Sequence, residues 1–189
     1  TKRELSRWKS SRQGRKGEDK VIESLRTSLD NRWTIIRNLQ LPGNRKDDID
    51  IGLVGPGGVW AVEVKAYGGT VRCQNDRWER QNGRKWEILK GNNPSSQVRS
   101  NAARLKDYLS RLGINLKWVE AVVTLAEPQP TTNFKSDNVA FWFLPTLDKQ
   151  TDNLVARIIP SEDQIDQTKK LLADLAQKQI VAEEAKYKK

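Results

Sequence analysis

The chain has 189 residues, enough for one compact domain with short extensions. Its 34 Lys and Arg residues outnumber 24 Asp and Glu, and the formal net charge of +10 favours an anionic partner, either nucleic acid or an acidic membrane surface. It contains no histidine and one cysteine, which excludes His-dependent catalytic triads and Cys/His zinc sites. Any metal would need oxygen ligands, which Mg²⁺ and Mn²⁺ prefer.

The same composition bears on the compartment. The single cysteine, Cys73, allows no intrachain disulfide and fits a reducing environment. No apolar run approaches the roughly 20 residues that span a bilayer, and no apolar core of a secretory signal follows the basic N-terminus. We therefore expect a cytoplasmic protein without a membrane partner.

The first 16 residues carry seven basic side chains against one acid. We expect a basic arm over residues 1–16 that contacts a phosphate backbone, and an ordinary solvated tail is the alternative. The residues predicted to bind nucleic acid are Arg12, Arg15, Lys16, Arg45 and Lys46.

A helix is predicted over residues 17–29, because Val21, Ile22 and Leu25 form one apolar stripe. Glu18 lies on that stripe as well, and a carboxylate aligned with a buried face needs a partner. The plainer alternative is a first-turn acid favoured by the helix dipole.

Residues 48–65 alternate apolar and polar side chains in two runs that predict two strands joined by a tight turn. If residues 56–57 are the central turn residues, Asp50 pairs with Glu63, and their Cβ atoms lie about 5 Å apart. Facing carboxylates repel unless a cation lies between them. Lys65 shares the face of Glu63, so the three residues suggest a metal-dependent phosphodiesterase. A bulge at the turn would shift the register by one residue and send one carboxylate to the other face.

The rest of the chain predicts a mixed sheet with helices on its faces, an α/β fold. Near the predicted turn at Asn82-Gly83, Trp78 and Trp86 either stack on bases or pack against the domain, and packing is the preferred interpretation. Strands are predicted over residues 33–39, 118–125 and 139–144, with a two-stranded ribbon over residues 70–88. A helix is predicted to begin at Asn93-Pro94 and to end at Gly113, with an apolar stripe of Val98, Ala102, Leu105, Leu109 and Leu112. A capping box at Ser161–Gln164 predicts the start of a last helix, and residues 179–189 form a charged tail.

Four motifs in this order resemble the nuclease-related domain (NERD) family, which belongs to the PD-(D/E)XK nuclease superfamily. The resemblance covers roughly residues 14–136, and it departs from the family at Ala66, where Asn is frequent. It implies a restriction-endonuclease-like core, a central mixed β-sheet flanked by α-helices, in a domain over residues 17–178. The motifs are Gly14-Arg15-Lys16-Gly17-Glu18, Asp48-Ile49-Asp50, Gly57-Gly58-Val59-Trp60-Ala61-Val62-Glu63-Val64-Lys65 with Gly69, and Asn93-Pro94-Ser95-Ser96-Gln97.

The resemblance also implies roles for five residues of this chain. Asp50 and Glu63 look like the metal-binding carboxylates, and Lys65 looks like the catalytic lysine. Glu18 resembles the helical acid that supports the metal or its waters, so it joins the predicted metal ligands. Gln97 resembles the helical glutamine near the site.

The sequence therefore predicts a Mg²⁺- or Mn²⁺-dependent nuclease that acts on DNA, with RNA as the second substrate. Asp50 and Glu63 are expected to hold the metal, and Lys65 is expected to assist the attacking water. One alternative is a non-catalytic nucleic-acid-binding or sensing module that retains the fold. Another is a protein-interaction or small-anion-binding domain attached to further modules.

Overall fold

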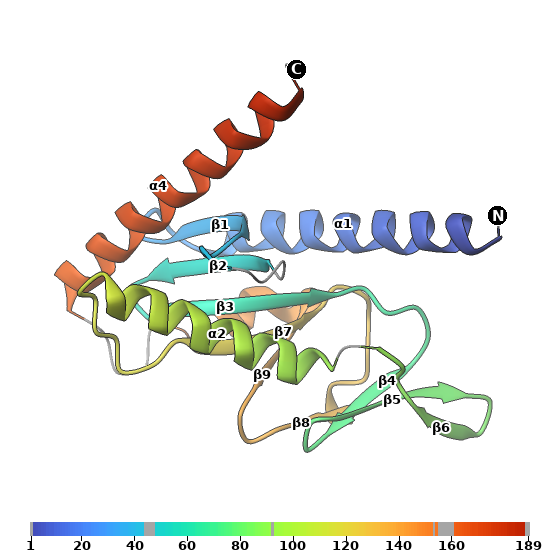
Figure 1. Ribbon diagram of the computed structural model, residues 1–189. Coiled ribbons are helices and arrows are strands. Elements are labelled where there is room, and N and C mark those ends of the chain that lie inside the picture. Colours follow the sequence, from blue (N-terminus) through green and yellow to red (C-terminus); the bar gives the residue numbers. More distant parts are fainter. Residues whose placement is uncertain (1, 44–47, 92, 153, 155–160, 188–189) are drawn as a thin grey trace.

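A five-stranded mixed sheet forms the centre of the computed structural model (Figure 1). The model describes residues 2–43, 48–91, 93–152, 154 and 161–187, without the side chains of residues 2–13 and 186–187. Neighbours are antiparallel from β1 to β3 and parallel from β3 to β9, which confirms the predicted α/β class. The strands in spatial order are β1 (Thr34–Leu39), β2 (Ile49–Gly55), β3 (Gly58–Lys65), β7 (Glu120–Leu125) and β9 (Ala140–Phe143).

Helices cover both faces of this sheet and enclose a separate core on each. On one face, α2 packs on β3 and β7 while α4 packs on β1 and β2, around buried Leu105 and Leu172. On the other face, α1 and the short α3 enclose Leu25 and Trp60. The central strands are therefore buried on both sides, as expected for parallel neighbours. The helices are α1 (Lys2–Ser28), α2 (Pro94–Arg111), α3 (Leu147–Thr151) and α4 (Glu162–Tyr187), with 3₁₀ turns at Thr131–Asn133 and Leu144–Thr146.

A second, four-stranded sheet projects from the body beyond the end of β3 (Figure 1). Trp78 is 3% exposed and packs edge-on against Phe134 and Phe141, so the predicted packing role of Trp78 is confirmed. The turn lies at Gly83-Arg84, one residue later than predicted, because Asn82 already pairs with Lys85. The strands in spatial order are β6 (Lys85–Ile88), β5 (Arg77–Asn82), β4 (Val71–Gln74) and β8 (Phe134–Lys135).

The β2–β3 hairpin has the predicted register. Gly55 pairs with Gly58 and Ile51 pairs with Val62, so residues 56–57 are the two turn residues and no bulge intervenes. The side chains of Ile51 and Val62 join the core under α1. The next position along the ladder brings Asp50 toward Glu63.

The helix boundaries differ from the prediction at both ends of the chain. Helix α1 begins at Lys2 rather than at Gly17, and α4 continues through Tyr187 rather than ending before Gln179. A glycine costs a helix about 1 kcal/mol without ending it, and the charged end of α4 lacks a residue that stops a helix. At the start of α4, Gln164 and Ser161 form the predicted reciprocal cap.

Gly17 has a packing function within α1. A Cβ atom at Gly17 would lie 3.0 Å from the Cβ of Ala66 and 3.1 Å from the Cβ of Ala126. The missing side chain therefore lets α1 approach the ends of β3 and β7 closely. This approach brings Glu18, the next residue, to the edge of the sheet where β3 ends.

Helix α2 begins as predicted, with the Asn93 side chain accepting a hydrogen bond from the Ser96 N–H over 3.1 Å. Its apolar stripe is buried as far as Leu109, whereas Leu112 is 49% exposed, contrary to the prediction. Leu112 lies outside the core because it is the C-cap residue, where the chain turns away. None of the helices described is long and apolar enough to cross a membrane.

Candidate functional site

Asp50 lies where β2 and β3 separate. The backbone ladder between the strands ends at Ile51 and Val62. Beyond it, Asp50 Oδ2 accepts a hydrogen bond of 2.8 Å from the backbone N–H of Val64, so a carboxylate takes the position of a strand carbonyl. Burial raises the pKa of Asp50 to about 6, and the Val64 N–H offsets only part of that effect.

Glu63 is the most deeply buried acid of this region, with 1% of its surface exposed. Its Oε1 atom accepts a hydrogen bond from Lys65 Nζ, while Oε2 has no hydrogen-bond partner among the described residues. Burial, followed by the negative charge of Asp50, raises the pKa of Glu63 to about 7. A buried carboxylate with an unsatisfied oxygen is costly, so this position favours a cation or a proton.

Lys65 supplies a fixed positive charge at the same point. Its side chain is 24% exposed and forms an ion pair with Glu63. Burial disfavours the charged ammonium, but the field of Glu63 and their hydrogen bond outweigh it and raise the pKa of Lys65. Lys65 is therefore a charged group that reaches from the protein interior to the surface.

Glu18 joins this group from α1. Its negative charge acts on both Asp50 and Glu63, although Glu18 Oε2 is bound by Arg37 Nη2 at 3.2 Å. Arg37 also binds Asp19 at 2.6 Å, so one guanidinium holds two successive acids of α1.

Two residues near the site were not predicted from the sequence. Arg37 lies on β1 opposite Ile51, and it contacts Glu18 and Asp19 of α1. Tyr67, two residues after Lys65, interacts electrostatically with Lys65 and Glu63, and burial raises its pKa. The sequence signal that could have identified Tyr67 is its position two residues after Lys65, which in an extended strand puts both side chains on one face.

The remaining predicted residues are less closely connected. Gln97 is half-buried in the first turn of α2, and its side chain forms no hydrogen bond with any described residue. Arg15 and Lys16 are exposed on α1, immediately before Gly17. The side chain of Arg12, and Arg45 and Lys46 as a whole, lie outside the described residues.

The carboxylates of Glu18, Asp50 and Glu63 are ligands that a hard divalent cation prefers, but the three do not form a ready-made metal site. No three acidic or other ligating side chains among the described residues converge closely enough to hold a metal. Arg37 binds Glu18, and Lys65 binds Glu63. Magnesium sites commonly use only one or two carboxylates, with substrate phosphates and waters completing the shell. Asp50 and the unpaired oxygen of Glu63 match that smaller requirement.

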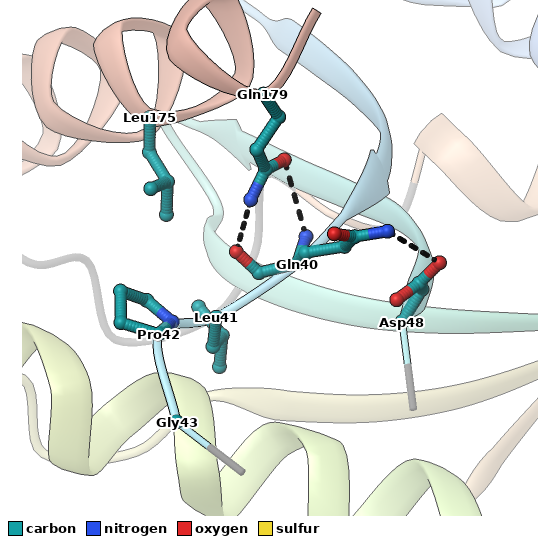
Figure 2. A pocket seen from close by; sticks show the side chains of 7 residues that line it. All are labelled: Gln40, Leu41, Pro42, Gly43, Asp48, Leu175 and Gln179. Carbon is teal, nitrogen blue, oxygen red and sulfur yellow. Dashed lines mark hydrogen bonds between the residues drawn. The ribbon is translucent and has the colours of Figure 1, made fainter. Parts of the chain in front are cut away.

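A pocket of about 510 Å³ lies beside this region, between α4 and the ends of β1 and β2 (Figure 2). Asp48, two residues before Asp50, accepts a hydrogen bond from the side-chain amide of Gln40 at its wall. The amide of Gln179 joins the backbone of Gln40 from α4. These contacts attach α4 to the strand that leads into the site.

The chain matches a known protein family. The family model described as nuclease-related domain matches residues 13–126, more than half of the chain, and this span includes α1 from its middle, the hairpin and all of α2. No curated protein and no solved structure shows a significant match. The chain belongs to the nuclease-related domain family.

Proposed function

We propose that this domain is a divalent-metal-dependent nuclease that hydrolyses phosphodiester bonds of DNA, with RNA as the second substrate. The observation that carries the proposal is the buried, half-satisfied carboxylate of Glu63 beside Asp50 and Lys65. A core carboxylate with this environment is explained by a ligand that it binds. Family membership supports the same chemistry.

Each residue has a distinct role in this proposal. Asp50 and Glu63 would hold Mg²⁺ or Mn²⁺, which when bound neutralises charge on phosphorus and activates water. Lys65 orients the attacking water and stabilises negative charge that develops on the phosphate, a role suited to a compact ammonium on a flexible stem. Glu18 would support the metal or its waters from α1, where Arg37 binds its carboxylate.

Residues around this centre would contact the rest of the substrate. Arg15 and Lys16 are exposed on α1, three and two residues before Glu18, and their charges would suit contact with a phosphate backbone. Gln97 resembles the family's helical glutamine near the site, and in that position it would contact substrate or solvent. The unpaired thiol of Cys73 is buried and fits a reducing compartment such as the cytoplasm.

The direct test is DNA cleavage with Mg²⁺ or Mn²⁺, repeated with chelator, by wild type and Glu63→Ala. Removal of a group that stabilises the transition state costs about 100- to 1,000-fold, so we expect a loss of at least that size. Glu127→Ala is the matched control, because Glu127 pairs only with exposed Lys20 at 3.4 Å. Equal, low cleavage by wild type and Glu63→Ala contradicts the proposal.

A second function, a nucleic-acid-binding module without catalysis, is favoured by one observation. Lys65 already neutralises one oxygen of Glu63, so the described structure stabilises the acid without a metal. Salt-dependent DNA binding that survives Glu63→Ala, with no cleavage under any divalent cation, would establish this alternative.

A further inference from the structure

The four-stranded sheet has one face that packs on the body and one that does not. Because side chains alternate along a strand and paired residues share a face, Cys73 and Trp78 define the buried inner face. The opposite side is here called the outer face. It comprises Arg72, Gln74, Arg77, Glu79, Gln81, Trp86, Ile88 and Lys135.

An aromatic ring and a guanidinium are stacked on the outer face. The Arg72 guanidinium carbon lies 4.2 Å from the centroid of the Trp86 ring. Arg72 is held in place from the other side, since its Nε donates to Glu79 over 2.7 Å. The Trp86 indole is thus oriented before any ligand arrives. Its half-exposed ring lies on β6, the edge strand of this sheet.

The charges of the outer face are predominantly positive. Arg77 also binds Glu79, at 3.2 Å, so the one carboxylate of this face is covered by two guanidinium groups. Lys135 adds a third, exposed cation, and Arg84 adds another at the adjoining hairpin turn. Arg84 has no acidic partner among the described residues.

An aromatic platform surrounded by cations matches the chemistry of unpaired nucleotides. Bases stack on aromatic rings irrespective of sequence, while Arg and Lys bind the phosphates between them. Ile88, 63% exposed two residues from Trp86, extends the apolar platform. A duplex presents its phosphates but not its base faces, so Trp86 specifically favours a single strand.

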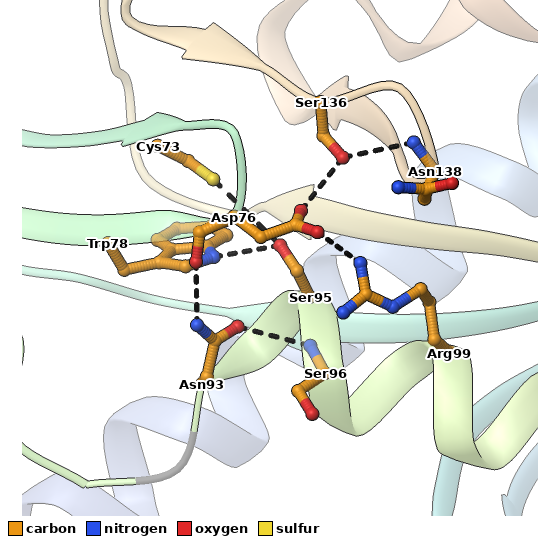
Figure 3. A network of polar contacts seen from close by, with 9 residues as sticks. All are labelled: Cys73, Asp76, Trp78, Asn93, Ser95, Ser96, Arg99, Ser136 and Asn138. Atoms are coloured by element: carbon orange, nitrogen blue, oxygen red, sulfur yellow. Dashed lines mark hydrogen bonds and ion pairs between the residues drawn. The ribbon is translucent and has the colours of Figure 1, made fainter.

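A network of polar contacts joins the four-stranded sheet to helix α2 (Figure 3). Asp76, in the β4–β5 turn, accepts hydrogen bonds from Ser136 over 2.8 Å and from Arg99 of α2. Trp78 donates to Ser95, the second residue of α2, over 2.9 Å.

The chain between the two regions is also short. The six steps from Lys65 to Val71 span at most about 20 Å, since an extended chain covers about 3.3–3.6 Å per residue. Trp86 lies on β6, two strands beyond β4 and hence about 10 Å farther. A single strand of several nucleotides could therefore reach both regions.

We propose that the outer face binds unpaired nucleotides of a DNA or RNA strand, with Trp86 as the base-stacking platform. This inference rests on the proposed function only in taking nucleic acid as the ligand. The sheet would hold a single-stranded segment next to the hydrolytic site.

The test measures binding of a fluorescein-labelled oligo(dT) of about 20 nucleotides by anisotropy, in chelator so that no cleavage occurs. Stacking is commonly worth about tenfold or more per base, so Trp86→Ala should weaken binding at least tenfold while duplex binding changes little. Trp118→Ala is the matched control, because Trp118 is 38% exposed beneath Lys117 at 4.6 Å but lies outside the outer face. It should change affinity less than twofold.

Two further variants protect the test against misfolding. Trp86→Phe keeps an aromatic surface and should retain affinity within about threefold. Arg84→Ala should reduce the slope of log K against log salt by about 0.7, the value for one phosphate contact on a single strand. Thermal melts of each variant establish that it is folded.

The possible outcomes separate this inference from the nuclease proposal. Equal affinities of folded Trp86→Ala and Trp118→Ala overturn the inference even if Glu63-dependent cleavage is found. Trp86-dependent binding without cleavage supports it while the nuclease proposal fails. Absence of oligonucleotide binding altogether also overturns it.

Discussion

Glu63→Gln is expected to stabilise the folded protein in the absence of metal. The pKa of Glu63 is raised from an ordinary 4.5 to about 7, so the folded state holds a proton that the unfolded chain releases. The contribution of the group is fully present below pH 4.5 and is lost as the pH rises through 7. At pH 8, a shift of this size corresponds to a penalty of about 3 kcal/mol, because one pKa unit equals about 1.4 kcal/mol.

Glutamine imitates the neutral acid and removes that penalty. We expect the free energy of unfolding of Glu63→Gln to exceed that of wild type by about 2–3 kcal/mol at pH 8, and by less than about 1 kcal/mol at pH 5. Urea titrations in chelator at both pH values measure the difference.

Glu79→Gln provides a control with the opposite sign. The hydrogen bond from Arg72 lowers the pKa of Glu79, so its substitution should destabilise the protein at pH 8. Two results would refute the reasoning that burial of an uncompensated charge dominates this site. One is a Glu63→Gln protein less stable than wild type at pH 8. The other is a difference in the free energy of unfolding between variant and wild type that is the same at both pH values.

Three further predictions concern packing, metal and the second sheet. Gly17→Ala should destabilise the protein by about 1–3 kcal/mol in thermal or urea unfolding, because its new Cβ would meet the Cβ atoms of Ala66 and Ala126, which are fixed to the backbone. A Cβ at Gly14 would meet no described atom within 4 Å, so Gly14→Ala should raise the free energy of unfolding by up to about 1 kcal/mol. Mn²⁺ at about 100 times its dissociation constant should raise the Tm of wild type by about 5–10 °C in scanning fluorimetry but leave Glu63→Gln unchanged, and equal shifts would count against the metal site. For Asp76, burial favours the neutral acid but hydrogen bonds from Ser136 and Arg99 outweigh it and lower its pKa, so its contribution is present above pH 3.8 and lost below it. Urea unfolding should show Asp76→Asn about 1–2 kcal/mol less stable at pH 7 and nearly equal to wild type at pH 3.

The hairpin was predictable because its information is local. A period-2 pattern fixes which side chains share a face, and a two-residue turn fixes which residues pair. The observed pairing of Gly55 with Gly58 and of Ile51 with Val62 follows from those two facts alone. The caps at Asn93 and Ser161 were predictable for the same reason, since a cap involves residues only three apart.

The contacts that complete the site depend on distant residues. Arg37 reaches Glu18 because β1 pairs with β2 and α1 crosses the same edge, and neither relation is encoded within a short window. The stacking of Arg72 on Trp86 likewise needs the register of β4 on β5 and of β5 on β6. Local patterns therefore placed Glu63 and Lys65 on one strand face, but they gave no indication of Arg37 or of the Arg72–Trp86 stack.

The burial of Glu63 argues that its charge serves a ligand rather than the fold. Val59 and Ala61, which precede Glu63 on the same face of β3, are apolar and stabilise the domain by their burial. Lys65 compensates only one of the two carboxylate oxygens, and the neighbouring charge of Asp50 adds to the cost. A neutral residue at position 63 would remove both the unpaired oxygen and the repulsion from Asp50. The fold alone gives no reason for an acid there, whereas a bound divalent cation would convert the same buried carboxylates from a source of instability into ligands.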